Sequence, residues 1–286
     1  AAMHSPEDYR KIISDGHGLP ADACATLGTA ANMNMACVET RSFRDLSVTA
    51  VCTGGVEANG GRAGDPASYF ETADGFEKVS AETEPPVAGT INTMVFINRP
   101  LIPGAMVRVV MTATEAKTAA LQELAVNSRA PDGLATGTGT DQIAVAAAQG
   151  DFHKLTSAGK HAKLGELIGR SVLAAVKSTL ALQNRLTPAG QCSAKIHLER
   201  FGISRQDMVA LTCRYLTKEQ AELLKNNFWG IERDPVTVAA MAALVHLKDK
   251  FAWGILPLNC WPEIMGAYAA QIACAVSGDY SLMADY

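Results

Sequence analysis

The sequence predicts an α/β fold: a single domain with a mixed sheet flanked by long helices and a mainly helical C-terminal portion. Three patterns in the 286 residues lead to this prediction. Leu46–Cys52 alternates apolar and polar residues, as a half-buried strand does, and Thr90–Ile97 is rich in β-branched and apolar residues. Thr156 or Ser157 is expected to cap a long helix that runs to about Leu186, and its apolar residues recur every three or four positions from Leu164 to Leu180. Strands that alternate with long helices favour a sheet covered by helices.

The other elements follow from residue spacing and turn chemistry. Ala105–Leu124 has apolar and threonine residues at spacings of three and four, which predicts a second long helix. Ile143–Ala148 is an apolar run and predicts a buried strand. Turn residues interrupt the chain at Gly54–Pro66, which holds five glycines, and at Leu134–Thr140. Four further helices are expected toward the C-terminus, at Cys192–Phe201, Lys218–Asn226, Thr237–Lys250 and Asn259–Ala275.

The chain shows no internal repeat and no low-complexity linker. We therefore expect residues 25–216 to form a core and residues 217–286 a helical extension of the same domain. A proline-containing connector is predicted at Ser80–Gly89. Gly165 and Gly169 lie inside the long predicted helix, where each glycine costs about 1 kcal/mol relative to alanine. Close approach of another backbone or of a ligand would explain them.

Composition and charge exclude several classes of protein. With 25 Lys+Arg against 29 Asp+Glu, the formal net charge is −4, which argues against nucleic-acid binding. The longest apolar stretch, Val238–Leu247, is too short to span a membrane, and residues 1–6 lack the pattern of a signal peptide. The seven cysteines form no C-x-x-C pair, so reduced, mostly buried thiols are expected. We expect a cytoplasmic protein without nucleic-acid or membrane partners.

A first polar cluster lies in the glycine-rich stretch Gly54–Pro66. Its glycines would let the backbone wrap closely round a ligand, and Glu57, Asn59, Arg62 and Asp65 lie among them. The guanidinium of Arg62 offers a planar fork for a carboxylate, phosphate or amide oxygen. The alternative is that Arg62 and Asp65 pair with each other and only order the loop.

A second cluster, Thr136–Asp141, places three hydroxyls and a carboxylate close together among small residues. It is only loosely similar to a phosphate-binding loop, and the lysine that closes such a loop is absent, so nucleotide hydrolysis is disfavoured. Asp141 can act as a general base for water or hold a Lys or His in place. It can also cap a neighbouring element.

A third cluster surrounds Glu115. On the predicted helix, Glu115, Thr118 and Gln122 share one face, while Lys117 points well away from Glu115. This polar stripe is either the wall of a site or a solvated surface.

A fourth cluster, Gly159–Glu166, places Lys160 and His161 near the predicted start of the long helix. Cations are unfavourable there because of the helix dipole, so the segment suggests a bound anion, and Glu166 offsets part of the charge. A histidine such as His161 can act as a general acid or base. The alternative is an ordinary surface histidine.

In this order, the four clusters resemble the adenosylcobinamide amidohydrolase family of corrinoid salvage. The resemblance extends over about Gly28–Leu216, and nothing after Leu216 contributes to it. The similar segments are SVTAVCTGGVEANGGRAGDPASYFE (Ser47–Glu71), GTINTMVFINRPLIPGAMVRVVMTATEAKTAALQEL (Gly89–Leu124), LATGTGTDQIAVA (Leu134–Ala146) and GKHAKLGELIGRSV (Gly159–Val172).

The resemblance implies an amidohydrolase that cleaves the aminopropanol amide of adenosylcobinamide or related corrinoids. The product, adenosylcobyric acid, re-enters cobalamin biosynthesis. No resident cofactor is implied, since cobalt arrives as part of the corrinoid substrate. The residues that match the family's motifs are Asn59, Arg62, Asp65, Asn92, Glu115, Lys117, Thr138, Thr140, Asp141, Lys160, His161 and Glu166.

Two routes of amide hydrolysis fit these residues. In the first, Asp141 or Glu115 activates water, backbone N–H groups of Gly137–Thr140 stabilise the oxyanion, and Lys160 or His161 protonates the leaving amine. In the second, Thr138 or Thr140 is a nucleophile assisted by Lys117. The residues expected to bind substrate are Asn59, Arg62, Asp65, Asn92, Lys117, Gly137, Gly139 and Glu166.

Three alternatives stay open from the sequence. The chain can be a corrinoid- or tetrapyrrole-binding module without catalysis, or an unrelated amidase or acyltransferase that shares the Gly/Thr loops. It can also be a metal-dependent hydrolase in which Asp65, Glu115, Asp141 and His161 bind a divalent ion, although their spacing does not demand a metal. The sequence is also compatible with a homo-oligomer.

Overall fold

The fold is taken from a computed structural model, which describes residues 6–56, 59–73, 75–79, 89–130 and 133–285. The chain divides into two compact units, each assembled from three segments. Unit 1 contains Ala1–Gly55, Gly89–Lys117 and Thr140–Thr179. Unit 2 contains Val56–Ala88, Thr118–Gly139 and Leu180–Tyr286. The predicted boundary at residue 216, with both parts in one domain, stays a prediction.

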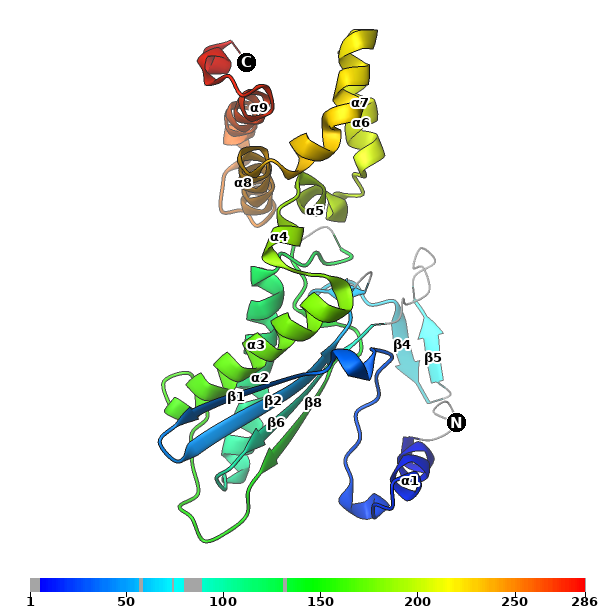
Figure 1. Cartoon of the computed structure of the whole chain (residues 1–286), viewed down its shortest axis with the longest axis vertical. Coiled ribbons are helices and arrows are strands. Elements are labelled where there is room, and N and C mark those ends of the chain that lie inside the picture. Colours follow the sequence, from blue (N-terminus) through cyan, green and yellow to red (C-terminus); the bar gives the residue numbers. More distant parts are fainter. Residues whose placement is uncertain (1–5, 57–58, 74, 80–88, 131–132, 286) are drawn as a thin grey trace. The chain divides into compact units, whose positions relative to one another are not determined.

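Unit 1 contains a four-stranded mixed sheet with the order β1-β2-β6-β8 (Figure 1). Neighbours among β1, β2 and β6 are antiparallel, whereas β8 pairs with β6 in parallel. Parallel pairing requires a crossover connection, which helix α2 (Pro103–Glu123) supplies. The strands are β1 (Cys37–Phe43), β2 (Leu46–Gly54), β6 (Ile91–Ile97) and β8 (Gln142–Ala147). The predicted mixed sheet with long helices is therefore confirmed.

One face of this sheet is buried and the other is partly open. Val48 and Ile91 are fully buried, whereas Phe96, which points to the opposite face, is 44% exposed. The alternation follows from strand geometry, since successive side chains point to opposite faces. Helix α3 (Lys163–Asn184) lies along the sheet (Figure 1), and its Ser171 hydroxyl donates to the Val48 carbonyl at 3.3 Å.

The prediction that Ile143–Ala148 forms a fully buried strand is wrong in its burial. The corresponding strand β8 lies at the edge of the sheet, and its side chains are half-buried or exposed. An apolar run cannot by itself distinguish a central strand from an edge strand. The strand β1, at the opposite edge, was not predicted, because its polar residues dilute the alternating pattern.

The long helix begins later than the predicted capping residue implies. It starts at Lys163 rather than at Thr156 or Ser157. In a helix, the carbonyl of Ala158 would accept the N–H group four residues later. The N–H four residues later, that of Ala162, instead donates to the Gly159 carbonyl at 2.9 Å, which is a turn, and the Ala158 carbonyl accepts the Thr112 hydroxyl at 2.8 Å.

Gly165 and Gly169 of α3 have different surroundings. A Cβ atom added at Gly165 would lie 2.1 Å from the carbonyl oxygen of Gly159, so only glycine permits this approach of the preceding loop. At Gly169 nothing lies within 4 Å of an added Cβ. The expected close backbone approach is therefore confirmed at Gly165 and wrong at Gly169.

The first part of unit 2 consists of short strands. Strand β3 (Gly60–Gly61) pairs antiparallel with β7 (Gly137–Thr138), so the two glycine-rich turns lie side by side. Strands β4 (Tyr69–Thr72) and β5 (Gly75–Lys78) form a hairpin that residue spacing did not predict. The predicted connector Ser80–Gly89 lies outside the described residues, except for Gly89.

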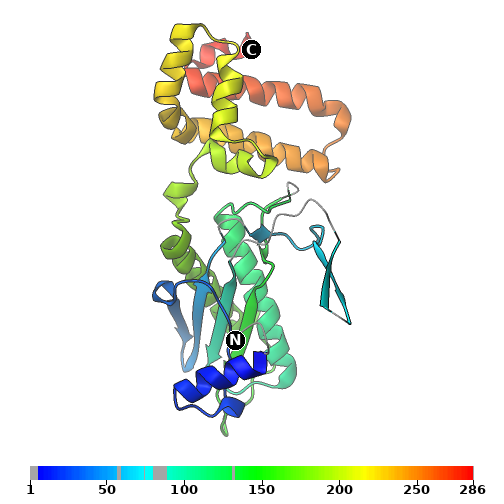
Figure 2. The same cartoon turned by 90° about the vertical axis from the view of Figure 1, so that its right-hand side faces the viewer.

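The C-terminal part of unit 2 is helical, as predicted (Figure 2). The predicted helices at Lys218–Asn226 and Thr237–Lys250 are present and longer, the one at Asn259–Ala275 is present but shifted by two residues, and α6 is an additional helix. Capping boxes begin both α6 and α7, where a Ser or Thr hydroxyl and a side chain three residues later bond the opposite backbone N–H groups. The helices are α4 (Pro188–Gln191), α5 (Ala194–Leu198), α6 (Arg205–Cys213), α7 (Lys218–Arg233), α8 (Pro235–Ala252) and α9 (Trp261–Ser277).

Two ion pairs connect these C-terminal helices, and each includes a buried carboxylate. Glu232, on α7, accepts hydrogen bonds from the Ser193 hydroxyl and the Arg205 guanidinium, and these bonds lower the pKa of its carboxyl group against the opposing effect of burial. Arg200 donates to Asp249 of α8 at 2.5 Å. Each pair satisfies charges that would otherwise be costly to bury.

All seven cysteines are free, but only Cys52 and Cys274 are buried, so the expectation of mostly buried thiols is wrong. Burial raises the pKa of the Cys52 thiol to about 11, although a hydrogen bond with Thr93 opposes this effect. Cys52 is therefore a protonated core residue rather than a nucleophile. Among the described residues, no helix combines the length and apolar character needed to cross a membrane.

Gly165→Ala is expected to destabilise the protein by about 1–3 kcal/mol, because the backbone must shift to accommodate the new methyl group. Gly169→Ala is the matched control, and up to about 1 kcal/mol of stabilisation is expected because alanine favours the helix. Urea denaturation measures both effects. A Gly165→Ala protein as stable as the Gly169→Ala protein would contradict the close approach of the loop to α3.

Candidate functional site

The centre of the candidate site in unit 1 is a buried ion pair between Lys117 and Asp141. The Lys117 ammonium donates to Oδ2 of Asp141, and the two side chains are 8% and 11% exposed. Oδ1 of the same carboxylate accepts the backbone N–H of Ile91 at 2.9 Å. The pair thus joins α2 to the starts of β6 and β8. Of the roles predicted for Asp141, the structure shows that it holds a lysine and also binds a strand terminus.

Three further hydrogen bonds hold the neighbouring segments together. The Thr90 hydroxyl donates to the Thr140 carbonyl at 2.7 Å, and the Thr140 hydroxyl donates to the Gly89 carbonyl at 3.0 Å. The Gly55 N–H donates to the Thr90 carbonyl at 3.0 Å. The segments that contain the GTIN and GTGTD sequences are therefore fixed against each other at one end of the sheet.

Two buried polar side chains at this end of the sheet have unsatisfied atoms. Thr53 of β2 and Asn92 of β6 are directly opposite each other and are 6% and 5% exposed. The Asn92 amide donates to the Gly28 carbonyl at 2.8 Å. Its Oδ1 atom and the Thr53 hydroxyl have no partner among the described residues. Each buried polar group left unsatisfied costs about 1–3 kcal/mol, so these two atoms are available to a further hydrogen-bond partner.

Asn92 was predicted as a site residue, but Thr53 was not. The sequence gives only a weak indication that Thr53 belongs to a site: it is a polar residue that interrupts the apolar residues just before the Gly54–Gly55 turn that ends the strand.

A second group of predicted residues lies on another side of α2. Glu115 pairs with Lys160 at 3.0 Å, and both side chains are largely exposed. Residues two apart on a helix point about 200° away from each other, so Glu115 and Lys117 face different surroundings, as the sequence predicts. Lys160 and His161 line an open cavity of about 500 Å³ together with Arg108.

Glu166 belongs to the exposed surface of α3. It pairs with Lys163 at 2.5 Å and with Arg170 at 3.3 Å. The hydrogen bond from Lys163 is the main cause that lowers the pKa of the Glu166 carboxyl group. Lys160 and His161 lie before α3 rather than in its first turn. The first turn of α3 contains Lys163, and Glu166 offsets the charge of Lys163.

In unit 2, the glycine-rich stretch pairs closely with the Gly/Thr turn. Gly60 is opposite Thr138, and Gly61 is opposite Gly137. A Cβ atom added at Gly60 would lie 2.7 Å from the Asn127 carbonyl oxygen, so this position requires glycine. Gly139 is exposed with open space around it, and the boundary between the units falls directly after it.

Asp65 orders the glycine-rich stretch, but not through the Arg62 guanidinium. Its carboxylate accepts the backbone N–H of Arg62 at 2.7 Å and also the Ser128 hydroxyl. The Arg62 guanidinium lies over the Trp253 ring, 6.0 Å from its centroid. Asn59 directly precedes β3, and Glu57 of the first polar cluster lies outside the described residues.

The described residues contain no group of three or more His, Cys, Asp or Glu side chains arranged to hold a metal ion. The carboxylates of the metal-dependent alternative have other contacts. Asp141 binds Lys117, Glu115 binds Lys160, and Asp65 binds Ser128.

Comparison with known families identifies the chain. The family model described as adenosylcobinamide amidohydrolase matches residues 1–188, more than half of the chain. The chain belongs to the adenosylcobinamide amidohydrolase family. An uncharacterized protein of Methanocaldococcus jannaschii is 36% identical over 193 residues, which cover 64% of this chain and 73% of the relative. No solved structure matches the chain.

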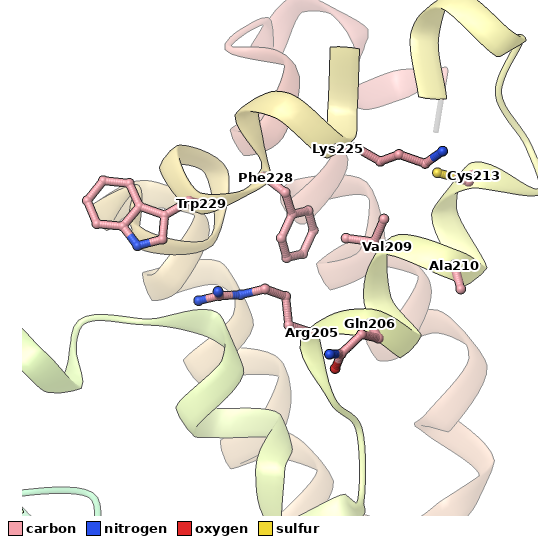
Figure 3. A pocket seen from close by; sticks show the side chains of 8 residues that line it. All are labelled: Arg205, Gln206, Val209, Ala210, Cys213, Lys225, Phe228 and Trp229. Atoms are coloured by element: carbon pink, nitrogen blue, oxygen red, sulfur yellow. The ribbon is translucent and has the colours of Figure 1, made fainter. Parts of the chain in front are cut away.

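The part of this adenosylcobinamide amidohydrolase family member that follows residue 188 contains a separate cavity of about 480 Å³ between α6 and α7 (Figure 3). Phe228 projects toward its middle, and Arg205 and Lys225 lie at its sides. Both cations already have acidic partners, Glu232 and Glu222. The lining is therefore mainly apolar, with balanced charge.

Thr53→Val tests whether the buried hydroxyl is unsatisfied in this amidohydrolase family member. The free protein is expected to be as stable as the wild type or more stable, because valine removes a polar group that has no hydrogen-bond partner among the described residues. Thr112→Val is the matched control. It leaves the buried Ala158 carbonyl without its hydrogen bond, and a loss of about 1–3 kcal/mol is expected. Equal losses in urea denaturation would show that the Thr53 hydroxyl has a structural partner.

Proposed function

We propose that the chain hydrolyses the aminopropanol amide of adenosylcobinamide and releases adenosylcobyric acid and aminopropanol. Membership of the adenosylcobinamide amidohydrolase family supports this reaction class. The observation that supports a reaction centre in unit 1 is the buried Lys117–Asp141 pair, which joins the TEAK and GTGTD segments to the start of β6. A buried pair of this kind at the end of a sheet is typical of a functional site as well as of a structural one.

Asp141 is proposed as the general base. Its two oxygens accept hydrogen bonds from Lys117 and from the Ile91 N–H, which hold the carboxylate in a fixed orientation. Each carboxylate oxygen has a second lone pair, so Asp141 can also accept a proton from water. The water oxygen bonds to the amide carbon as Asp141 takes its proton. The protonated Asp141 then donates that proton to the amide nitrogen as the C–N bond breaks.

Lys117 is proposed to stabilise the negative charge that develops on the amide oxygen. An ammonium group has three donors, and its bond to Asp141 uses one. A fixed cation in a buried site stabilises an oxyanion more strongly than it would in water. The alternative oxyanion site at the backbone of Gly137–Thr140 stays a prediction.

The geometry favours activated water over a threonine nucleophile. The Thr140 hydroxyl donates a hydrogen bond to the Gly89 carbonyl rather than to a side chain that could act as a base. Lys117 contacts Asp141 instead of a threonine hydroxyl. Lys160 is paired with Glu115 on another side of α2, so the proposed route returns the proton to the amine from Asp141 rather than from Lys160 or His161.

The reaction is tested by incubating the protein with adenosylcobinamide and analysing the corrinoids by mass spectrometry. Adenosylcobyric acid and aminopropanol are expected in equal amounts. A spectral titration that shows corrinoid binding without either product would instead support a binding module. If neither binding nor hydrolysis occurs, the proposed substrate class is wrong.

Asp141→Asn is expected to lower kcat by about 10²–10⁴-fold, because the amide cannot act as the base. The variant also leaves Lys117 without its charged partner, so stability must be measured in parallel. Asp249→Asn is the matched control, since it disrupts an equally buried ion pair with Arg200 in the C-terminal helices. Full activity in Asp141→Asn, or an equal activity loss in a folded Asp249→Asn protein, would reject the proposed role of Asp141.

A further inference from the structure

The open cavity at Arg108 has an excess of positive charge. It is lined by Arg108 from α2 and by Lys160 and His161 from the loop before α3, with the hydroxyl residues Thr156 and Ser157 between them. The lining thus combines two permanent cations, a histidine and two neutral hydrogen-bond donors.

Only part of this charge is neutralised within the protein. Glu115 pairs with Lys160 at 3.0 Å. No carboxylate among the described residues pairs with Arg108, whose guanidinium contacts the Met111 sulfur at 3.8 Å. One carboxylate therefore faces two cations and a histidine. Like charges repel one another, so an added anion would lower the electrostatic energy of the cavity.

The cavity is preorganised because its loop is held by backbone contacts. The Thr112 hydroxyl binds the Ala158 carbonyl, and Gly165 permits the Gly159 carbonyl to approach α3. Gly159 lies beside Arg108, since a Cβ atom there would be in ordinary van der Waals contact with the guanidinium, 3.4 Å from Nε. Arg108 and Lys160 are thus brought together by a fixed loop, and little ordering is required when a ligand binds.

We propose that this cavity binds a phosphate group carried by a small molecule. A guanidinium can donate two parallel hydrogen bonds to phosphate, and an ammonium and hydroxyl groups can serve the remaining oxygens. The cavity volume of about 500 Å³ exceeds that of a single phosphate, so a phosphate ester fits better than the free ion. The site is distinct from the Lys117–Asp141 pair, because Arg108 precedes Lys117 by nine residues on α2, a distance of roughly 13 Å along the helix axis.

Isothermal titration of the wild-type protein with inorganic phosphate tests the site directly. Saturable binding of one phosphate is expected, and affinity should fall as ionic strength rises. Arg108→Gln is expected to weaken binding about tenfold, because it removes a charge-assisted donor. Arg170→Gln is the control, since Arg170 is an exposed arginine on α3 that pairs with Glu166 away from the cavity.

Two results would overturn the proposal. One is the absence of saturable phosphate binding to the wild type. The other is equal weakening by Arg108→Gln and Arg170→Gln, which would indicate general attraction to surface charge. Both measurements use binding alone, so they are independent of whether the protein hydrolyses adenosylcobinamide.

The source of the phosphate is distinguished by comparing cobinamide with cobinamide phosphate in a spectral titration. Tighter binding of the phosphate-bearing corrinoid, with the advantage lost in Arg108→Gln, would show that the cavity recognises the substrate itself. Equal corrinoid affinities together with saturable binding of inorganic phosphate would show that the cavity takes a separate phosphate compound. Either result supports the site and identifies its use.

Discussion

The arrangement of unit 1 depends on the buried ion pair between Lys117 and Asp141. A lysine that is almost fully buried must have a charged partner, and removing one member of such a pair costs about 3–5 kcal/mol. The pair therefore fixes the position of α2 relative to the ends of β6 and β8. The threonine hydrogen bonds around Thr90 and Thr140 have their geometry only because these ends are brought together. One contact, between Lys117 and Asp141, thus offsets the electrostatic cost of burying the lysine and positions the proposed reaction centre.

The sequence predicted the central elements better than the peripheral ones, for physical reasons. Strands β2 and β6 have alternating burial, and the sequence of β2 shows that alternation directly. Strand β1 has polar residues at an exposed edge, so its pattern is weak. The predicted start of α3 is too early because Thr156 and Ser157 are suitable capping residues, whereas the helix starts at Lys163. The loop before it is bound to α2 by a tertiary hydrogen bond from Thr112 to Ala158, which no local pattern encodes.

The candidate site shows the same division between local and distant information. Local spacing correctly placed Glu115 and Lys117 on different sides of a helix. Local spacing also suggested that Asp65 pairs with the Arg62 side chain, but the carboxylate binds the Arg62 backbone instead. Lys117, the partner of Asp141, is 24 residues away in the sequence. The sequence therefore predicted that Asp141 could bind a lysine or a histidine, but not which one. The unsatisfied atoms of Thr53 and Asn92 became visible only when the two strands were paired.

Because of the close contact at Gly165, the loop before α3 is held in place by its backbone and not by the side chains that line the cavity. Helix α3 contacts this loop at the backbone of Gly159, while Lys160 and His161 line the cavity. Changes to those side chains need not disturb the anchor that positions them. The side chains at positions 160 and 161 can therefore differ between relatives, or be redesigned, to change ligand preference while the backbone of the loop keeps its position.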